Sequence, residues 1–334
     1  MAEPTVAAGF VRGLLELAVA GGADRGALAE RSGIDLADLD DQDARVPFAR
    51  YVALMRAGQV LARDPALALH FGETVDMREL SIVGLIGQSC TTVMEAFAQV
   101  NRYARLTLDV DLGTGDRLEL ATMSDGLWIA DRRPDPNAFP ELTESSFARM
   151  AASGRRLGVG SPLKEVHVTH PAPAYRSEYD RIFECPISFD APWNAVRVDP
   201  SIMALPLALQ PRYVFGLLSE RANVLLKELE DARTTRGRVE SLLIPILHGG
   251  DSGIDRIAAE MGVSRQTLYR RLKAENVTFE KLLDELRHRL ALDYLAGNRV
   301  SINETAYLVG FSERAAFARA FKRWTGRGPG SARR

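Results

Sequence analysis

The C-terminal third of the chain contains Ile254-Asp-Arg-Ile-Ala258-Ala-Glu-Met-Gly262-Val-Ser-Arg-Gln-Thr-Leu268-Tyr-Arg-Arg-Leu272, and 48 residues further on Ile302-Asn-Glu-Thr-Ala306-Tyr-Leu-Val-Gly310-Phe-Ser-Glu-Arg-Ala-Ala-Phe317-Ala-Arg-Ala-Phe321. Each stretch predicts a short helix, a glycine turn and a second helix rich in arginine. This arrangement is typical of a helix-turn-helix unit, whose second helix lies in the major groove of DNA. A single match also fits an ordinary helical hairpin, but two matches with the same spacing favour DNA binding.

Small residues at fixed positions make the two turns possible. An alanine four residues before the glycine lets the second helix approach the first. Glycine closes the first helix, because it adopts the left-handed C′ conformation at little cost. A serine two residues after the glycine stands where the next helix needs an N-cap. These positions are Ala258, Gly262 and Ser264 in the first stretch, and Ala306, Gly310 and Ser312 in the second.

The two units differ in the length of the turn and are joined by one long helix. Leu268 follows its glycine by six residues and Phe317 by seven, so the second turn is one residue longer. Ser301-Ile-Asn-Glu304 predicts a capping box at the start of the second unit. The stretch 278–296 has no Pro or Gly and predicts a helix about 28 Å long. That length is near the ~34 Å that separates successive major grooves on one face of DNA.

The segment from about Arg236 to Arg334 resembles the DNA-binding domain of AraC/XylS-type transcription regulators. The resemblance rests on the two units, on Arg287-x-x-x-Ala291-x-x-Tyr294-Leu295, and on Gly310-Phe-Ser through Phe317-x-Arg319-x-Phe321-Lys-Arg-Trp-Thr-Gly326. The family ends on Gly-x-Ser-Pro-x-x-Tyr-Arg. This chain keeps Pro329 and Arg333 of that ending but has Ala332 in place of the aromatic residue.

The motif positions imply which side chains contact DNA. Arginine can bind guanine through two hydrogen bonds, and glutamine suits adenine in the same way. Other basic side chains of the two helices are better suited to phosphate, and each of the arginines also fits that role or a solvated one. We expect base contacts from Gln266, Tyr269, Arg270, Arg314, Ala315 and Arg319, and phosphate contacts from Arg265, Arg271, Lys273 and Lys322.

Charge is divided unevenly along the chain. The net charge of the 334 residues is −2, but residues 233–334 hold 19 Lys and Arg against 11 Asp and Glu. A basic C-terminal third beside an acidic remainder fits one DNA-binding face and one part that does not bind DNA. The N-terminus lacks a signal peptide and no stretch approaches 18 apolar residues, so we expect a cytoplasmic protein that does not enter a membrane.

The N-terminal two-thirds predict an α+β domain with helices and an antiparallel sheet. Between Leu106 and Asp131 three alternating segments separated by glycine turns predict a β-meander. Expected helices cover 6–20, 47–62, 65–73, 92–106 and 141–157, the meander strands cover 106–112, 117–123 and 127–131, and further strands cover 165–169 and 195–198.

This region, about 20–205, resembles the N-terminal effector domain of one large subgroup of the family. The resemblance rests on the phrases that begin at Leu80, Val166 and Phe183: Leu-Ser-Ile-Val-Gly-Leu-Ile, Val-His-Val-Thr-His-Pro-Ala-Pro and Phe-Glu-Cys-Pro-Ile-Ser-Phe-Asp-Ala-Pro. It implies a small-molecule effector whose identity the label "arabinose-binding" does not assign.

The sequence has no catalytic constellation, so we expect no enzyme activity and no cofactor or metal. His167 and His170 lie three apart in a predicted strand, which puts them on opposite faces. The two cysteines, Cys90 and Cys185, cannot supply the zinc cluster and methyl acceptor that some DNA-repair regulators combine with a similar domain.

The stretch from Pro211 to Glu230 predicts a helix with an apolar seam. Two interpretations of this seam stay open: a helix that packs on its own domain, or a dimer helix that joins the sensor to the DNA-binding domain. Thr234 to Gly237 would then be a flexible joint. The seam consists of Phe215, Leu218, Ala222, Leu225 and Leu229.

The sequence therefore predicts three parts: an effector-sensing domain over 1–210, a linker helix over 211–235, and an all-α DNA-binding domain with two helix-turn-helix units over 236–334. The expected function is sequence-specific transcription regulation controlled by a small molecule. Expected partners are double-stranded DNA, the effector, RNA polymerase and a second copy of the chain. The alternative is an architectural DNA-binding protein without an effector. A 200-residue appendage favours the first reading, because bending DNA does not need one.

Overall fold

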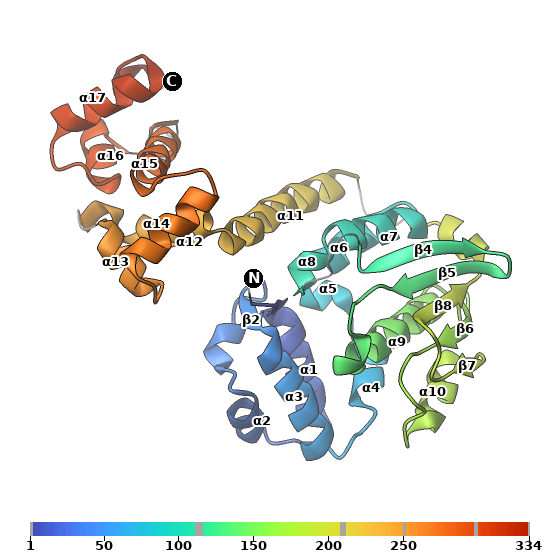
Figure 1. Cartoon of the computed structure of the whole chain (residues 1–334). Helices are drawn as coiled ribbons and strands as arrows, with labels where there is room; N and C mark the ends of the chain where they lie inside the picture. The colour runs from blue at the N-terminus through green and yellow to red at the C-terminus, as the bar shows by residue number, and fades with distance from the viewer. Residues whose placement is uncertain (1–2, 111–115, 208–211, 250–251, 297–299, 333–334) are drawn as a thin grey trace. The chain divides into compact units, whose positions relative to one another are not determined.

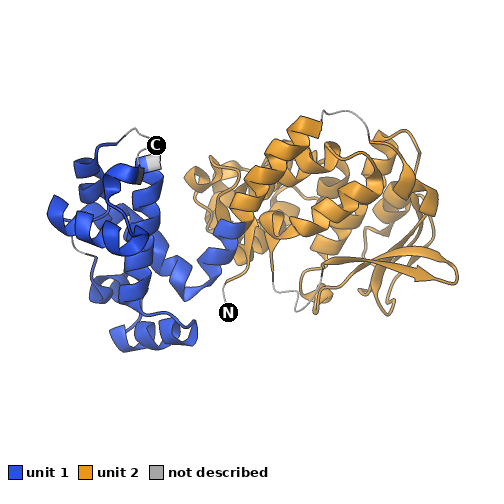
Figure 2. Ribbon diagram, turned by 90° about the horizontal axis from the view of Figure 1, so that it is seen from above, with its two compact units in different colours: residues 1, 227–334 blue, residues 2–226 orange. Residues whose placement is uncertain are grey.

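The computed structural model describes residues 3–110, 116–207, 212–249, 252–296 and 300–332. Residues 2–226 form one compact unit and residues 227–334 the other (Figure 2). The boundary lies inside one helix, α11 (Arg212–Arg233). Among the described residues, no helix combines the length and the apolar composition that crossing a bilayer requires.

The N-terminal unit begins with a helical part around a small sheet. Strand β1 (Thr5–Ala7) pairs antiparallel with β2 (Arg45–Pro47) and with β3 (Leu108–Asp109). The helices around it are α1 (Ala8–Ala20), α2 (Arg25–Ser32), η1 (Leu36–Leu39), α3 (Phe48–Leu61) and α4 (Leu67–Thr74). The predicted first strand of the meander is thus wrong in its pairing. Its described part, β3, joins β1, because Leu108 lies opposite Val6 in the core of the helical part. Residues 111–112 of that prediction lie outside the described residues.

The second sheet has the strand order β4-β5-β8-β6-β7 (Figure 1). Strands β4 (Leu118–Met123) and β5 (Gly126–Asp131) form the predicted hairpin. Strand β8 (Asn194–Val198) pairs antiparallel with β5 and with β6 (Leu163–His167), and the short β7 (Ile187–Ser188) pairs parallel with β6.

Two helices, α9 (Glu141–Arg156) and α10 (Arg176–Phe183), bury their apolar sides together with side chains of this sheet. Helix α4 crosses α9 at Gly72, where a Cβ atom would lie 2.2 Å from the carbonyl oxygen of Ser145. This close approach joins the helical part to the part that contains the sheet. The remaining short elements are α5 (Met77–Leu80), α6 (Ile82–Gln88), α7 (Val93–Arg102), α8 (Ala104–Thr107), η2 (Pro136–Ala138) and η3 (Pro200–Ala204).

The C-terminal unit is helical, as predicted. Its core combines buried side chains from all its α-helices, with Leu268, Leu272, Phe317 and Phe321 almost fully buried. The stretch Thr234 to Gly237, predicted as a joint, contains the start of a helix, because the Thr234 hydroxyl accepts the Gly237 N–H at 2.8 Å and caps α12. The elements are α12 (Thr235–Leu243), η4 (Ile244–Gly249), α13 (Ile254–Glu260), α14 (Arg265–Ala274), α15 (Phe279–Ala296), α16 (Ile302–Leu308), α17 (Arg314–Thr325) and η5 (Pro329–Ala332).

Candidate nucleic-acid interface

The turns between the paired helices have the same geometry in both helix-turn-helix units. In each, the glycine has a positive φ, and the residue after it donates its N–H to the carbonyl oxygen of the alanine five positions earlier. In the first unit φ is +66° at Gly262, and the nitrogen of Val263 lies 3.0 Å from the carbonyl oxygen of Ala258. In the second unit φ is +79° at Gly310, and the nitrogen of Phe311 lies 2.9 Å from the carbonyl oxygen of Ala306. This is the Schellman pattern of a helix C-terminus. The predicted role of the two glycines is confirmed, and both alanines are buried.

The N-caps of the second helices differ between the units. The Ser264 hydroxyl accepts the Thr267 N–H at 3.2 Å and caps α14, as predicted. The matching prediction for Ser312 is wrong, because the N-cap of α17 is Glu313 and its side chain makes no capping bond. The reason is the extra residue in the second turn, which moves the helix start to Arg314.

The start of the second unit is capped from both directions. The Ser301 hydroxyl accepts the Glu304 N–H at 3.1 Å, and the Glu304 carboxylate accepts the Ser301 N–H at 2.8 Å. This confirms the predicted capping box, which satisfies two backbone donors of α16.

Helix α14 exposes a polar face and buries an apolar one. Leu268 and Leu272 are buried, whereas the predicted base-contacting residues of this helix are all exposed. A hollow of about 470 Å³ lies along the exposed face, lined by Gln266, Thr267, Tyr269, Arg270 and Lys273. Lys273, predicted to contact phosphate, thus shares this face with the predicted base readers.

The remaining predicted phosphate contacts of α14 lie outside that hollow. Arg265, the first residue of the helix, forms an exposed ion pair with Asp255 at 3.2 Å. Arg271 is also exposed. No local pattern of residues predicts the Arg265–Asp255 pair, because the two residues come together only when α13 and α14 fold against each other.

Helix α17 presents the corresponding face 49 residues later. Phe317 and Phe321 take the buried places of Leu268 and Leu272, and Arg314, Ala315, Arg319 and Lys322 are exposed. In this register Ala315 corresponds to Gln266, Arg319 to Arg270, and Lys322 to Lys273. Arg314 then corresponds to Arg265, although the motif predicted a base contact for Arg314 and a phosphate contact for Arg265. Ala318, which the sequence reasoning omitted, corresponds to Tyr269.

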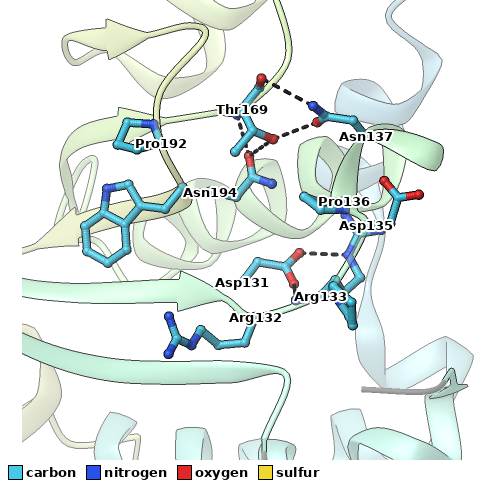
Figure 3. A pocket seen from close by; sticks show the side chains of 11 residues that line it. Asp131, Arg132, Arg133, Asp135, Pro136, Asn137, Thr169, Pro192 and Asn194 are labelled. Carbon is cyan, nitrogen blue, oxygen red and sulfur yellow. Dashed lines mark hydrogen bonds and ion pairs between the residues drawn. The ribbon is translucent and has the colours of Figure 1, made fainter. Parts of the chain in front are cut away.

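In the N-terminal unit a polar hollow of about 410 Å³ lies where β5 ends, beside the segments 134–137 and 192–194 (Figure 3). Its polar groups are largely bonded to one another. The Thr169 hydroxyl donates to Asn137 at 2.6 Å, and the Thr169 N–H donates to Asn194 at 2.8 Å. Asp131 accepts hydrogen bonds from both the N–H and the guanidinium of Arg133.

Helix α11 uses part of its predicted seam within the N-terminal unit. Ala222 is fully buried against Val83, Ile86 and Tyr103, and Phe215 and Leu218 are partly buried there. Leu225 and Leu229 are half-buried outside that cluster. Exposed apolar side chains of the same helix are Tyr213, Leu217 and Val224.

The two capped turns and the exposed, basic second helices define a helix-turn-helix protein of the class that binds duplex DNA. Residues 22–207 match the family model described as the arabinose-binding domain of AraC transcription regulators, N-terminal, and residues 257–334 match a helix-turn-helix domain. The chain belongs to the AraC family of transcription regulators.

Several known regulators are similar over most of the chain. The ornithine utilization regulator of Pseudomonas aeruginosa is 27% identical over 330 residues, 96% of this chain and 94% of that protein. The regulator VirS of Mycobacterium tuberculosis is 25% identical over 304 residues, 86% and 84% of the two chains. The crystal structure of the regulator CdpR from Pseudomonas aeruginosa aligns with 84% of this chain and 90% of its own, at 23% identity and a TM-score of 0.39.

Proposed function

We propose that this regulator binds specific DNA sites through α14 and α17 and that a small molecule bound by residues 2–226 controls it. The observation that carries the proposal is the face that α14 and α17 share. On both helices polar and basic side chains are exposed at corresponding positions, and the opposite side of the helix is apolar and buried. The acidic charge of the larger unit supports a role other than DNA contact for that unit.

Within the interface, we assign base readout to Gln266, Tyr269 and Arg270 of α14 and to Ala315 and Arg319 of α17. Lys273 and Lys322, which correspond to each other, are assigned to phosphate, together with Arg271. Because Arg265 and Arg314 both stand at the first residue of their helices, we propose the same role for both, a phosphate contact at the groove edge.

The two helix-turn-helix units would then contact DNA bases in different ways. Helix α14 carries a glutamine, a tyrosine and an arginine on its exposed face, so it can make several hydrogen bonds to base edges. Helix α17 has alanines at the positions of Gln266 and Tyr269, and alanine suits apolar contact with a thymine methyl group. Most of the hydrogen-bonded specificity would therefore come from the first unit.

The effector and the further partners are also proposals. The name of the ornithine utilization regulator, similar over nearly the whole chain, makes amino acids a reasonable first class of effector to test. We further propose that the protein acts in the cytoplasm as a homodimer through α11 and works with RNA polymerase at its promoters.

The test is fluorescence anisotropy with duplexes from the promoter regions beside the gene and with shuffled duplexes, each with and without candidate metabolites. A controlled regulator binds one promoter duplex at least tenfold more tightly than its shuffled version, and one metabolite changes that ratio. Equal binding of all duplexes, unchanged by every metabolite, would favour the architectural alternative.

A further inference from the structure

Arg149, in the second half of α9, is a half-buried arginine whose charge is not paired. Its guanidinium reaches the Ser146 hydroxyl at 3.5 Å. Among the described residues no carboxylate lies within ion-pair distance of it, and Glu141 and Glu144 on the same helix do not pair with it. Arg155 on the same helix, by contrast, pairs with Glu73 at 3.2 Å.

A second guanidinium converges on the same hydroxyl. Arg117 donates to the Ser146 oxygen at 2.9 Å and also contacts Asp131 at 3.2 Å. Asp131 is already shared, because Arg133 pairs with it at 3.1 Å. One carboxylate therefore serves two arginines and leaves the charge of Arg149 without compensation.

Arg117 also supplies an unused donor. Its Nε atom is buried and has no hydrogen-bond partner among the described residues. Burial, reinforced by the charge of Arg117, lowers the pKa of Arg149 to about 10. A partly buried charge without a counter-charge and a buried N–H without an acceptor are both costly, so this pair of arginines favours an anion.

We propose that Arg149 and Arg117 bind a carboxylate group of the effector. A carboxylate fits this set, because its two oxygens accept the forked N–H groups of one guanidinium while a lone pair remains for a second donor. The hollow of Figure 3 is the weaker candidate, since its polar groups are already bonded to one another. The inference rests on the proposed control of the regulator by a small molecule.

The uncompensated charge of Arg149 should lower the stability of the ligand-free protein. If Arg149 is held without a counter-charge in order to bind a ligand, its replacement by methionine removes a partly buried charge while keeping much of the side-chain volume. Arg149→Met should then raise the melting temperature of the ligand-free chain by at least about 2 °C, although it abolishes the response to carboxylates. An arginine with a purely structural role would give the opposite shift.

The experiment is thermal unfolding of the full chain with matched pairs of probes at millimolar concentration. Acetate is compared with acetamide, succinate with succinamide, and L-ornithine with 1,4-diaminobutane, which lacks only its carboxylate. We expect at least one carboxylate to raise the melting temperature of the wild type while its partner does not. Arg149→Met should lose that rise, and Arg31→Met, at an exposed position of α2, should keep it.

Any of four outcomes would overturn the inference: no carboxylate stabilises the wild type, each pair stabilises equally, Arg149→Met keeps the rise, or Arg149→Met melts below the wild type. DNA binding by the ligand-free wild type and Arg149→Met is measured in parallel. A wild type that fails to bind any promoter duplex refutes the proposed function, whereas normal DNA binding without a carboxylate response refutes only the carboxylate site.

Discussion

The guanidinium of Arg287 in α15 donates a hydrogen bond to the carbonyl oxygen of Gly310 across 3.3 Å. It also lies over the ring of Phe311, 5.1 Å from the ring centre. The linking helix thus holds the turn of the second unit directly. At Gly310 an added Cβ atom would lie 2.5 Å from the carbonyl oxygen of Leu247, whereas open space surrounds the same position at Gly262.

Replacing the two turn glycines should therefore have unequal effects. Both have left-handed backbones, and an alanine there costs about 1–2 kcal/mol. Gly310→Ala should destabilise residues 227–334 further, because the new methyl group meets the backbone of Leu247. Urea unfolding of that unit measures the difference from Gly262→Ala. Equal losses of unfolding free energy would show that the backbone near Leu247 moves aside readily.

DNA binding by residues 227–334 alone should depend strongly on salt. Six or more phosphate contacts predict a slope of log K against log salt of about −5 or steeper. Anisotropy titrations over a series of salt concentrations give the slope. Affinity that does not change with salt would argue against the proposed interface.

Arg270 and Lys273 lie on one face of α14 but should respond differently to substitution. Arg270→Ala should reduce binding to the preferred site by about 1–3 kcal/mol and relax the preference at one base pair. Lys273→Ala should weaken preferred and shuffled duplexes by similar factors. If Arg270→Ala also weakens both equally, Arg270 is a phosphate contact.

Helix α11 allows a matched test of dimerisation. Leu225 lies outside the cluster that buries Ala222, so Leu225→Glu should leave the fold intact and give a monomer, because an unpaired charge in an apolar interface is unfavourable. Light scattering and circular dichroism measure the two properties. As the control, Ala222→Glu should unfold part of the N-terminal unit. A wild type that is monomeric at tens of micromolar, or a Leu225→Glu chain that unfolds, would count against the dimer helix.

His70 should make the N-terminal unit more stable at low pH. Its imidazole nitrogens contact Asp64 at 2.7 Å and Glu178 at 3.0 Å. Partial burial opposes the charge, but these two hydrogen bonds outweigh it and raise the pKa of His70. Because the pKa of His70 is higher in the folded state, its contribution to stability is complete below the pKa of the unfolded state, about 6.5. This contribution is lost as the pH rises through the pKa of the folded state. Melting curves of wild type and His70→Gln should differ most near pH 5.5 and converge at higher pH; a constant difference would contradict this assignment.

Much of the DNA-binding unit was predictable from the sequence, because its features are local. The Schellman turns at Gly262 and Gly310, the Ser264 cap and the Ser301–Glu304 capping box each depend on residues within about six positions of one another. The N-cap of α17 was missed because one extra turn residue shifts the helix start, and a pattern of residue types does not resolve a shift of one position.

Local patterns along the chain were enough to identify the family, the two helix-turn-helix units and the apolar faces of their second helices, since periodicity and capping act over a few residues. The partners of groups far apart in the sequence became known from the three-dimensional fold. It paired β3 with β1 instead of β4, and it placed Ala222 against Val83 and Ile86. It also brought Arg117 to the Ser146 hydroxyl, which Arg149 contacts from the same helix. Such contacts depend on how whole helices and strands pack, and the spacing of residues along the chain does not carry that information.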